Sequence, residues 1–574
     1  MKLRLMKTIP RSKKYITKFS GYNNTQSVPE NGFCFTKNLS CDYHPVLSTR
    51  NKRGYITTLE NIDGMLFHNG LCIVQNSSFT FNGVKKGDVS LGEKQLVSMG
   101  AYVLIFPDKK YYNTSTDKFG SLENTFTSSS KVTYSLTDIT GKPYTVPYIS
   151  QTPPDSPQDG DYWINTSSTP HTLNIYSAQT LSWSGIVSTY IKISATGIDA
   201  GFKEYDSIAI SSSTVSSINS ANIISAIGTG YIIIPGIIDA VTVQSSTLTI
   251  KRTVPDMDFV TQLHNRVWGC SNSKHEIYAS KLSDPFNWNS FEGLSSDSYA
   301  VTIGDGDNFT GATSHLSSVL FFKEGHIIKI YGTKPSNFEV SAVTARGVQK
   351  GCHKSIAKVN ETLYYKSRWG VMGYDGGVPY CVSSPIDSVK YTNASAGAVA
   401  SKYYISMQDE SSVYRLFVYD TSKNLWMLED DTQAKGFVYI QGALCYVDNL
   451  GQLISITGET SLSPYVHNTG TPEKSIEWCA VTGPLGMSLP NKKYLSSLTL
   501  RMSALKGASL RVSVSYDSSP NFNEVFYAQV PDVKKSFDIR ITPRRCDHFA
   551  IKIEGEGEVR LHTLCKTIES GGSL

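Results

Sequence analysis

The feature that most constrains this fold is a recurrence of short apolar hairpins along most of the chain. Segments 96–113, 318–332, 414–430 and 442–456 are runs rich in Val, Ile, Tyr and Phe, interrupted by Gly, Asn or Asp. That pattern is typical of strands joined by tight turns. The first strongly apolar positions of successive units are Leu66, Tyr102, Trp268, Phe321, Tyr364, Tyr404 and Leu444. Their spacing is roughly 40 residues, except for one much longer interval after Tyr102.

A period of this length with several short strands per unit is typical of β-propeller blades. Each blade is a small sheet whose apolar faces are covered only by its neighbours. The repeats are too divergent to show a consensus motif, so we expect six to eight blades. If residues 130–254 are set aside, the long interval agrees with the others. The sequence therefore predicts an all-β dominated chain with a propeller over 38–129 and 255–474, interrupted by an inserted domain at 130–254.

The segments outside the repeats have their own characters. The insertion begins with a Ser/Thr/Pro-rich linker, continues with an aromatic hairpin pair at 160–178, and contains Ile and Ala at helical spacing between Ser211 and Ala226. It is therefore predicted to be a small mixed domain with one helix. Residues 475–568 alternate apolar and polar positions, which indicates a C-terminal β-sandwich. We expect 1–37 to be a basic N-terminal arm and 569–574 a flexible tail.

Composition excludes several classes of protein. Charged residues make up 18% of the chain and the formal net charge is +5, so the chain as a whole is no polycation. The 10 cysteines show no C-x-x-C, so neither a disulfide scaffold nor a cysteine metal site is predicted. The most apolar segment, 231–243, contains Pro235 and Asp239 and is shorter than the about 20 residues of a membrane span. We expect synthesis in a cytoplasm, no standard secretion signal and no membrane span.

Motifs for catalysis and cofactor binding are missing from the sequence. It contains no H-E-x-x-H, no G-x-S-x-G and no phosphate-binding glycine loop, so neither a cofactor nor a catalytic residue is predicted. Asp305, Asp307 and Asn308 offer oxygen ligands on one turn, but Leu316 stands where a calcium loop needs a carboxylate. We therefore interpret this turn as a blade connection. Carboxylates are plentiful, so a propeller glycan hydrolase with two facing carboxylates stays open.

Basic residues concentrate near the start of the chain, and Glu30 is the first acidic residue. Such a cluster is either a solvated tail, a docking site for an acidic protein surface or a nucleic-acid contact. The candidate docking residues are Lys2, Arg4, Lys7, Arg11, Lys13, Lys14 and Lys18, with a second cluster at Arg50, Lys52 and Arg53.

Four aromatic residues lie close together in the insertion: Tyr162, Trp163, Tyr176 and Trp183. They are either a platform on which glycans stack or the apolar core of a small domain, because each aromatic side chain buries a large area. Both interpretations stay open from the sequence.

Asn38 is followed by a Pro-x-Leu-x-x-Arg pattern at Pro45, Leu47 and Arg50, ahead of the first predicted blade. This pattern and the motifs after it, in their order along the chain, resemble the tail hub or nozzle proteins of short-tailed bacteriophages, of the stabilisation or tail tubular type, in which such a pattern leads into the first blade. The segment 263–288, with Arg-Val-Trp and Asp-Pro-x-x-Trp, resembles the family's most typical blade, and 361–377 resembles a later one. The Asp-His and Glu-Gly-Glu-Gly segments near the end resemble closing strands of related phage proteins.

The resemblance implies a structural, non-enzymatic role. In that family six copies form a ring below the portal and its adaptor and continue the channel through which DNA leaves. The implied partners are other copies of the chain, a portal–adaptor or head-completion protein, other tail proteins or fibres, and viral DNA that passes without sequence-specific binding. The implied location is the virion tail, assembled in the cytoplasm of the bacterial host. The alternatives are a receptor- or carbohydrate-binding tail module centred on Trp163 and Trp183, and a propeller glycan hydrolase.

Overall fold

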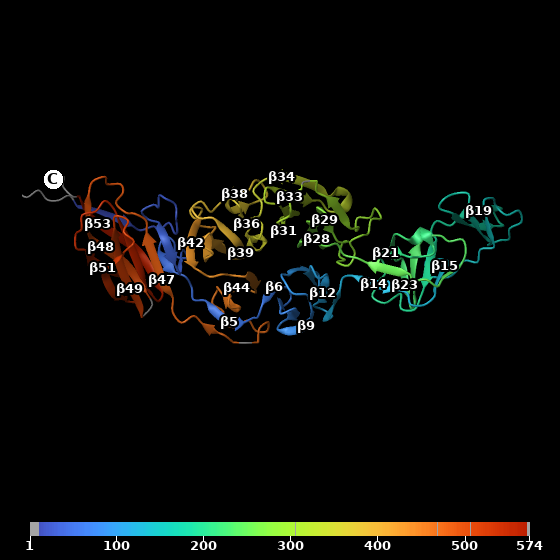
Figure 1. Cartoon of the computed structure of the whole chain (residues 1–574), viewed down its shortest axis with the longest axis horizontal. Helices are drawn as coiled ribbons and strands as arrows, with labels where there is room; N and C mark the ends of the chain where they lie inside the picture. Colours follow the sequence, from blue (N-terminus) through green and yellow to red (C-terminus); the bar gives the residue numbers. More distant parts are fainter. Residues whose placement is uncertain (1–10, 305, 468, 505–506, 571–574) are drawn as a thin grey trace, which may run out of the picture.

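The computed structural model describes residues 11–304, 306–467, 469–504 and 507–570. It is an elongated molecule built from many small sheets (Figure 1). Within these ranges there is no α-helix, and three short 3-10 turns are the only helical elements: η1 (Ser216–Ile218), η2 (Pro335–Asn337) and η3 (His353–Ser355). The predicted all-β character is confirmed. None of the helical turns in the described chain is long or apolar enough to cross a membrane.

The central part of the described chain consists of seven small antiparallel sheets, here called the ring sheets. Six are four-stranded meanders: β6 (Ile62–Phe67), β7 (Leu71–Gln75), β8 (Ser78–Phe81), β9 (Val84–Asp88); β10 (Gln95–Met99), β11 (Tyr102–Phe106), β12 (Lys110–Asn113), β13 (Lys118–Ser121); β27 (Phe259–Leu263), β28 (Arg266–Ser271), β29 (Glu276–Ala279), β30 (Tyr299–Thr302); β31 (Gly311–His315), β32 (Ser318–Phe322), β33 (His326–Tyr331), β34 (Glu339–Thr344); β35 (Ala357–Val359), β36 (Thr362–Ser367), β37 (Gly370–Tyr374), β38 (Tyr380–Cys381); β39 (Tyr391–Val399), β40 (Lys402–Asp409), β41 (Tyr414–Asp420), β42 (Leu425–Asp430). The seventh contains β43 (Gly436–Ile440), β44 (Ala443–Val447), β45 (Gln452–Ser455), β5 (Gly54–Thr58) and β46 (Thr471–Pro472).

Local sequence explains these meanders. His264 and Asn265 join β27 to β28 and both adopt positive φ, 52° and 55°, as a two-residue hairpin turn requires. The strands they join carry apolar residues on both faces: Val267, Trp268 and Cys270 on β28 are all buried. A sheet that is apolar on both faces must be covered on both sides by neighbouring sheets.

The ring sheets follow one another in a closed order. Contacts join β6 to β10, β10 to β27, β27 to β31, β35 to β39, β39 to β43, and β43 back to β6. One apolar core lies across the sheets that contain β32, β36 and β40, which completes the circuit. Separate cores fill the other spaces between neighbouring sheets. The last sheet also takes a strand from early in the chain, because β5 pairs antiparallel with β45.

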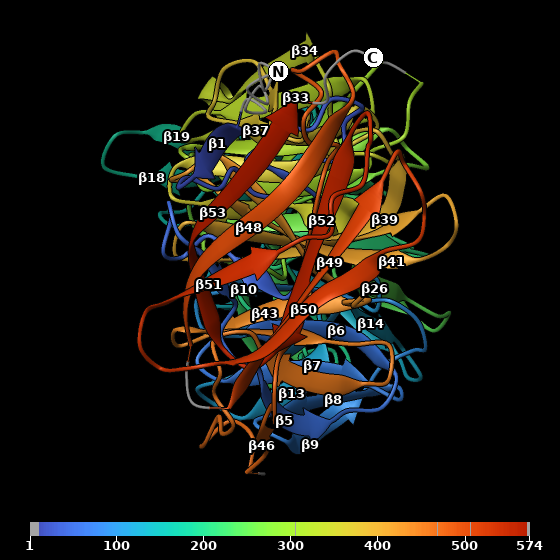
Figure 2. The same ribbon diagram turned by 90° about the vertical axis from the view of Figure 1, so that its left-hand side faces the viewer.

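Two further sheets pack face to face around one apolar core and form what we call the terminal two-sheet domain. Figure 2 views the molecule from this end. One sheet contains β1 (Arg11–Ile16), β3 (Leu39–Ser40), β4 (Leu47–Thr49), β53 (Val559–Ser570), β48 (Lys493–Ala504) and β51 (Lys535–Arg540). The other contains β2 (Phe33–Lys37), β47 (Glu477–Thr482), β52 (Phe549–Glu556), β49 (Ala508–Tyr516) and β50 (Asn523–Val530).

The described part of the predicted N-terminal arm belongs to this domain, so the prediction of a separate arm over 1–37 is wrong from residue 11 onward. β1 pairs with β53 and β2 pairs with β47. The segment joins this domain because Ile16, Phe19 and Phe33 are apolar and are buried in the shared core. Their burial outweighs the solvation of the nearby lysines. The predicted flexible tail likewise begins too early, because β53 extends to Ser570.

The insertion contains three sheets in the described chain. They are β14 (Asn124–Thr127), β26 (Thr249–Arg252), β21 (Ser207–Ser211), β22 (Ala221–Ile223); β23 (Ala226–Gly228), β24 (Tyr231–Pro235), β20 (Tyr190–Ser194), β15 (Val132–Thr137), β25 (Thr242–Gln244); and β16 (Tyr148–Ser150), β17 (Tyr162–Asn165), β18 (Thr172–Ser177), β19 (Ser182–Gly185). They project from the ring at the end opposite the terminal two-sheet domain, with β19 at the far tip (Figure 1).

The predicted helix between Ser211 and Ala226 is wrong, and the insertion is not a mixed domain. The segment holds the end of β21, the single turn η1, and β22. Polar side chains bind the backbone there: the backbone N–H of Ser213 donates to Asn219 Oδ1 at 2.9 Å, and Asn219 Nδ2 donates back to the Ser213 carbonyl at 2.8 Å. Ser and Asn compete with helical hydrogen bonds in this way.

The segment between β4 and β5 connects the terminal two-sheet domain to the ring through a buried ion-pair network. Arg50 Nη1 lies 2.7 Å from Glu473 Oε2, and Arg53 lies 2.6 Å from Glu429 Oε2 and 2.7 Å from Asp430 Oδ2. Burial alone lowers the pKa of Arg53, but the facing carboxylates outweigh it and hold that pKa well above its ordinary value.

This burial corrects the prediction that Arg50 and Arg53 form a docking cluster. The two residues are 6% and 8% exposed, and their guanidinium groups already bind carboxylates of this chain. Lys52, between them in the sequence, is partly exposed and its Nζ donates to the Lys474 carbonyl at 3.1 Å. Of this second cluster, Lys52 alone keeps an accessible side chain.

We expect Arg53→Ala to lower the free energy of unfolding by about 3–5 kcal/mol, because it removes the nearest cation from the buried carboxylate of Glu429 and from the half-buried carboxylate of Asp430. Urea unfolding followed by tryptophan fluorescence measures the change. Lys52→Ala is the matched control and should change stability by less than about 0.5 kcal/mol. Equal effects of the two substitutions would show that the network does not connect the domains energetically.

Candidate functional site

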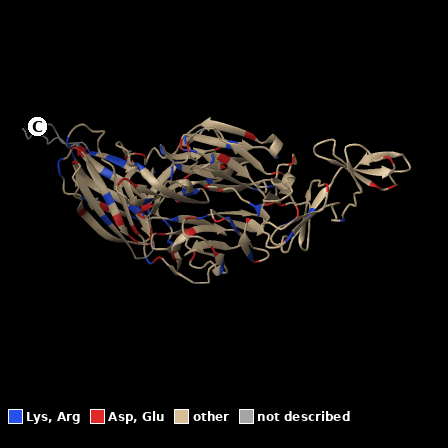
Figure 3. Ribbon diagram, turned by 45° about the vertical axis from the view of Figure 1, so that its right-hand side comes forward, with Lys and Arg blue, Asp and Glu red and all other residues tan. Residues whose placement is uncertain are grey.

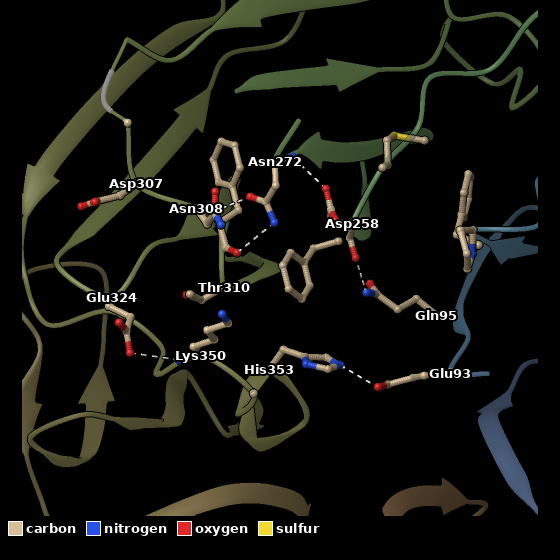
Figure 4. A pocket seen from close by; sticks show the side chains of 17 residues that line it. Glu93, Gln95, Asp258, Asn272, Asp307, Asn308, Thr310, Glu324, Lys350 and His353 are labelled. Carbon is tan, nitrogen blue, oxygen red and sulfur yellow. Dashed lines mark hydrogen bonds and ion pairs between the residues drawn. The ribbon is translucent and has the colours of Figure 1, made fainter. Parts of the chain in front are cut away.

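A cavity of about 760 Å³ lies among the loops at one face of the ring. Its lining comes from four ring sheets: the segments at or before the starts of β10, β27, β31 and β35, and the turns after β11, β28 and β32. Figure 4 shows the polar side chains that surround it. The labelled residues are Glu93, Gln95, Asp258, Asn272, Asp307, Asn308, Thr310, Glu324, Lys350 and His353. The cavity therefore exists only because the ring brings these loops together.

A polar bridge joins two loops across this cavity. Glu93 Oε1 lies 3.0 Å from His353 Nε2 and 3.0 Å from Lys354 Nζ. Glu93 precedes β10, whereas His353 and Lys354 precede β35, and two other ring sheets lie between these strands. The hydrogen bond from His353, with the charge of Lys354, lowers the pKa of Glu93 to about 2. The bridge thus holds an ionised carboxylate at the wall of this cavity.

Other polar groups of the cavity are bound to its own walls. Gln95 Oε1 accepts the Val260 N–H at 3.0 Å, and an Asp258 carboxylate oxygen accepts the Asn272 N–H at 2.7 Å. Glu324 Oε1 accepts the Lys350 N–H at 3.2 Å. These bonds fix the loops in place. A glycan hydrolase combines a carboxyl group that keeps its proton with a second carboxylate that is ionised. The lowered pKa of Glu93 fits only the ionised role.

The turn that carries Asp307 and Asn308, interpreted from the sequence as a blade connection, lies at this cavity. Asp307 and Asn308 line it, while Asp305 lies outside the described residues. Among the residues that the structure does describe, no group of three or more His, Cys, Asp or Glu side chains could hold a metal ion. Sequence inspection found this loop but missed Glu93, Lys350 and His353, because no local motif marks them.

The first basic cluster is only partly described, since Lys2, Arg4 and Lys7 lie outside the described residues. Arg11 pairs with Glu569 at 2.8 Å across β1 and β53. Lys14 Nζ donates to Ser488 Oγ at 2.9 Å, whereas Lys13 and Lys18 are exposed. The structure thus distributes these cations over one sheet and a following loop instead of an extended arm.

The four aromatic residues of the insertion lie on β17, β18 and β19, on the sheet at the tip of the molecule. Trp183 contacts Trp163 and Tyr176, with ring centroids 5.5 Å and 5.2 Å apart. Trp163 is 5% exposed and donates to Ser150 Oγ at 3.0 Å, whereas Tyr176 and Trp183 are partly exposed. Tyr162 packs separately against Tyr144. The structure therefore brings three of the four residues together and buries one of them.

Comparisons with known proteins give no family. No family model matches the sequence, and no curated protein matches it. Among solved structures, Raptor from Chaetomium thermophilum is 11% identical over 71% of this chain and 29% of its own, with a TM-score of 0.30. U3-55K is 7% identical over 70% of this chain and 98% of its own, with a TM-score of 0.28. An exo-β-1,3-galactanase from Phanerochaete chrysosporium is 10% identical over 54% of this chain and 94% of its own, with a TM-score of 0.21. Likeness at this level assigns no function.

We expect Glu93→Gln to reduce stability at pH 6 and to lose that effect in acid. The pKa of Glu93 is lower in the folded chain, so its contribution is present above the ordinary carboxyl pKa and disappears as the pH falls from about 4.5 to about 2. Because Glu93 is half exposed, we expect a difference of no more than about 1 kcal/mol. Urea unfolding of both proteins between pH 6 and pH 2.5 measures it.

Glu410→Gln, at an exposed carboxylate outside the cavity, is the control. A Glu93→Gln protein that unfolds like the wild type at pH 6 would contradict a stabilising bridge.

Proposed function

We propose that the ring sheets form a β-propeller of seven blades, one number within the expected six to eight. The cyclic order of contacts and the cores between neighbouring sheets support this. β5 would then close the ring by completing the last blade. In this proposal residues 38–129 and 255–474 carry the propeller, 130–254 most of the inserted domain, and 475–568 most of a C-terminal β-sandwich, to which β1 and β2 contribute strands.

We also propose that the protein is a non-enzymatic structural subunit of a bacteriophage tail, a hub or nozzle that assembles as a homo-oligomeric, hexameric ring below the portal and adaptor. The motifs that carry the resemblance have structural roles here. Arg266 is buried and donates to the Ser280 carbonyl at 2.8 Å. Trp288 is buried and its Nε1 donates to the Pro285 carbonyl at 2.9 Å. These residues stabilise a blade and its turn, which is a structural role.

The observation that carries this proposal is the linear arrangement of the molecule. The ring lies between the terminal two-sheet domain at one end and the inserted sheets at the other (Figure 1). A subunit of this form offers different surfaces to neighbours above and below it. The ring sheets keep its terminal two-sheet domain and its inserted sheets at a fixed separation. Hydrogen-bonded β sheets with covered faces suit such a rigid connector.

The charge distribution agrees with a wall along which DNA moves. Basic and acidic residues are interspersed along the ring and the terminal two-sheet domain (Figure 3). Each phosphate that a cation neutralises adds to binding, so a mixed surface holds a passing polyanion less than a continuous basic one. The proposed location is therefore the virion tail, with assembly in the host cytoplasm and with portal, adaptor and other tail proteins or fibres as partners.

We expect the purified chain to form a six-copy ring, alone or on a portal–adaptor complex. Light scattering gives the mass, and cryo-electron microscopy of the assembled particle gives the copy number and neighbours. A chain that stays monomeric in both settings would contradict the proposal.

A deletion of residues 1–10 belongs to the same experiment. It removes Lys2, Arg4 and Lys7 but leaves β1, which begins at Arg11. If the deletion abolishes binding to the adaptor while the six copies still assemble, these cations are the docking residues. Unchanged binding would exclude that role. Lys52→Gln tests the accessible lysine of the second cluster in the same way.

A second candidate is a receptor- or carbohydrate-binding tail module, which the aromatic cluster at the tip supports. Partly exposed Trp183 and Tyr176 beside buried Trp163 offer ring faces of the kind that stack on sugars. Trp183→Ala should then reduce binding on an array of bacterial surface glycans more than tenfold. Trp369→Ala, at an exposed tryptophan of the ring, should leave binding unchanged. Equal binding by both variants and the wild type would exclude this function for the tip.

A further inference from the structure

A trough of about 540 Å³ lies on the outward face of the sheet that contains β1, β53, β48 and β51. The inward residues of these strands, such as Ile16, Leu498, Ile539 and Leu564, are buried in the core of the terminal two-sheet domain. The outward residues alternate with them and are polar. Figures 1 and 2 place this sheet at the end of the molecule away from the inserted sheets.

Cross-strand register explains the shape of the trough. On the two middle strands, β53 and β48, short side chains form the floor; they are Thr563, Cys565, Thr567, Ser497 and Thr499. Longer side chains from the outer strands form the rims. Lys13 and Tyr15 on β1 lie beside Thr567 and Cys565, and Arg540 and Asp538 on β51 lie beside Ser497 and Thr499.

The trough carries more positive than negative charge. Lys13, Arg501 and Arg540 line it with one carboxylate, that of Asp538. Within the described chain, Lys13 and Arg540 form no ion pair, while Arg501 Nε donates to Ser536 Oγ at 3.2 Å. Asp538 Oδ1 accepts the hydroxyl of Thr499 at 2.7 Å. Lys13 and Arg540, on opposite rims at one level of the sheet, make the trough attractive to a ligand with more than one anionic group.

The remaining groups identify the rest of the ligand. Ser497, Thr563 and Thr567 provide hydroxyls that both donate and accept hydrogen bonds, and Asp538 accepts from hydroxyl donors. Tyr15 is 65% exposed at the rim and offers an aromatic face to an apolar ring face. We propose that this trough binds an acidic polysaccharide, with its carboxylates on Lys13 and Arg540 and its hydroxyls on the floor.

The same chemistry argues against nucleic acid. Proteins that bind single-stranded nucleic acid stack successive bases on several aromatic side chains along a continuous basic groove. Here one aromatic residue, Tyr15, lines the trough, so successive bases have no series of rings on which to stack. The strands are about 4.8 Å apart, so the rims are separated by about 14 Å, which suits a single extended chain.

The test measures binding of the full chain to polygalacturonate, alginate and hyaluronan oligosaccharides by calorimetry at low and high salt. A neutral cellulose oligosaccharide and single-stranded DNA of equal charge are compared in the same assay. The variants are Lys13→Gln, Arg540→Gln, their combination, and Tyr15→Ala, all at exposed side chains. Lys251→Gln, at an exposed lysine of the insertion, is the control.

We expect at least one uronic-acid oligosaccharide to bind, about fivefold weakening for each single charge removal, more than tenfold for the pair, and weaker binding in high salt. Tyr15→Ala should also weaken binding, and Lys251→Gln should not. The proposal is overturned if none of the three acidic oligosaccharides binds, if the neutral one binds equally well, or if DNA binds more tightly and is lost with the same variants. These measurements do not require ring assembly, so they are independent of the proposed tail function.

Discussion

The constraint on which the rest of the structure depends is that a four-stranded sheet with two apolar faces cannot exist alone. Each ring sheet buries residues such as Val267 and Phe321 against a neighbour, so the series is stable only if its first and last members also cover each other. They do so, because β43 contacts β6 and residues of both sheets, among them Ile73 and Val438, share one core. β5, which directly precedes β6 in the chain, pairs with β45 of the last sheet. The buried pairs of Arg50 and Arg53 with Glu473, Glu429 and Asp430 lie immediately before that strand. The cavity, the projecting insertion and the terminal two-sheet domain all take their positions from this closed circuit.

The parts of the fold that were predictable from the sequence are those determined by neighbouring residues. Hairpins such as 318–332 show two apolar runs on either side of a turn, and the structure has β32 and β33 there. The helix predicted between Ser211 and Ala226 is wrong because the helical spacing of Ile and Ala does not decide the structure there. Ser and Asn side chains bind the backbone of this segment instead. The separate N-terminal arm predicted from the lysines is wrong because Ile16, Phe19 and Phe33 lie in the same segment, and their burial decides where it lies.

The sites were less predictable because they are assembled from distant segments. The aromatic residues of the insertion are close in sequence, and three of them do come together. By contrast, Glu93 and His353 are 260 positions apart, and the trough combines β1 with strands near the other end of the chain. Pairings of this kind leave no local pattern. Arg53 was predicted to be an accessible docking residue but is buried. Nothing near it in the sequence distinguishes a buried structural arginine from an exposed one.

The pairing of β1 with β53 has a consequence for synthesis on the ribosome. Arg11 and its partner Glu569 are separated by 558 positions, and translation proceeds at about 5–20 residues per second. The strands β1 and β2 therefore wait on the order of a minute before β53 and β47 emerge to pair with them. During that interval Ile16, Phe19 and Phe33 lie outside their native core. The nascent chain consequently presents unpaired apolar strands until β47 and β53 have been translated, and we expect chaperones that shield such segments to bind it during this interval.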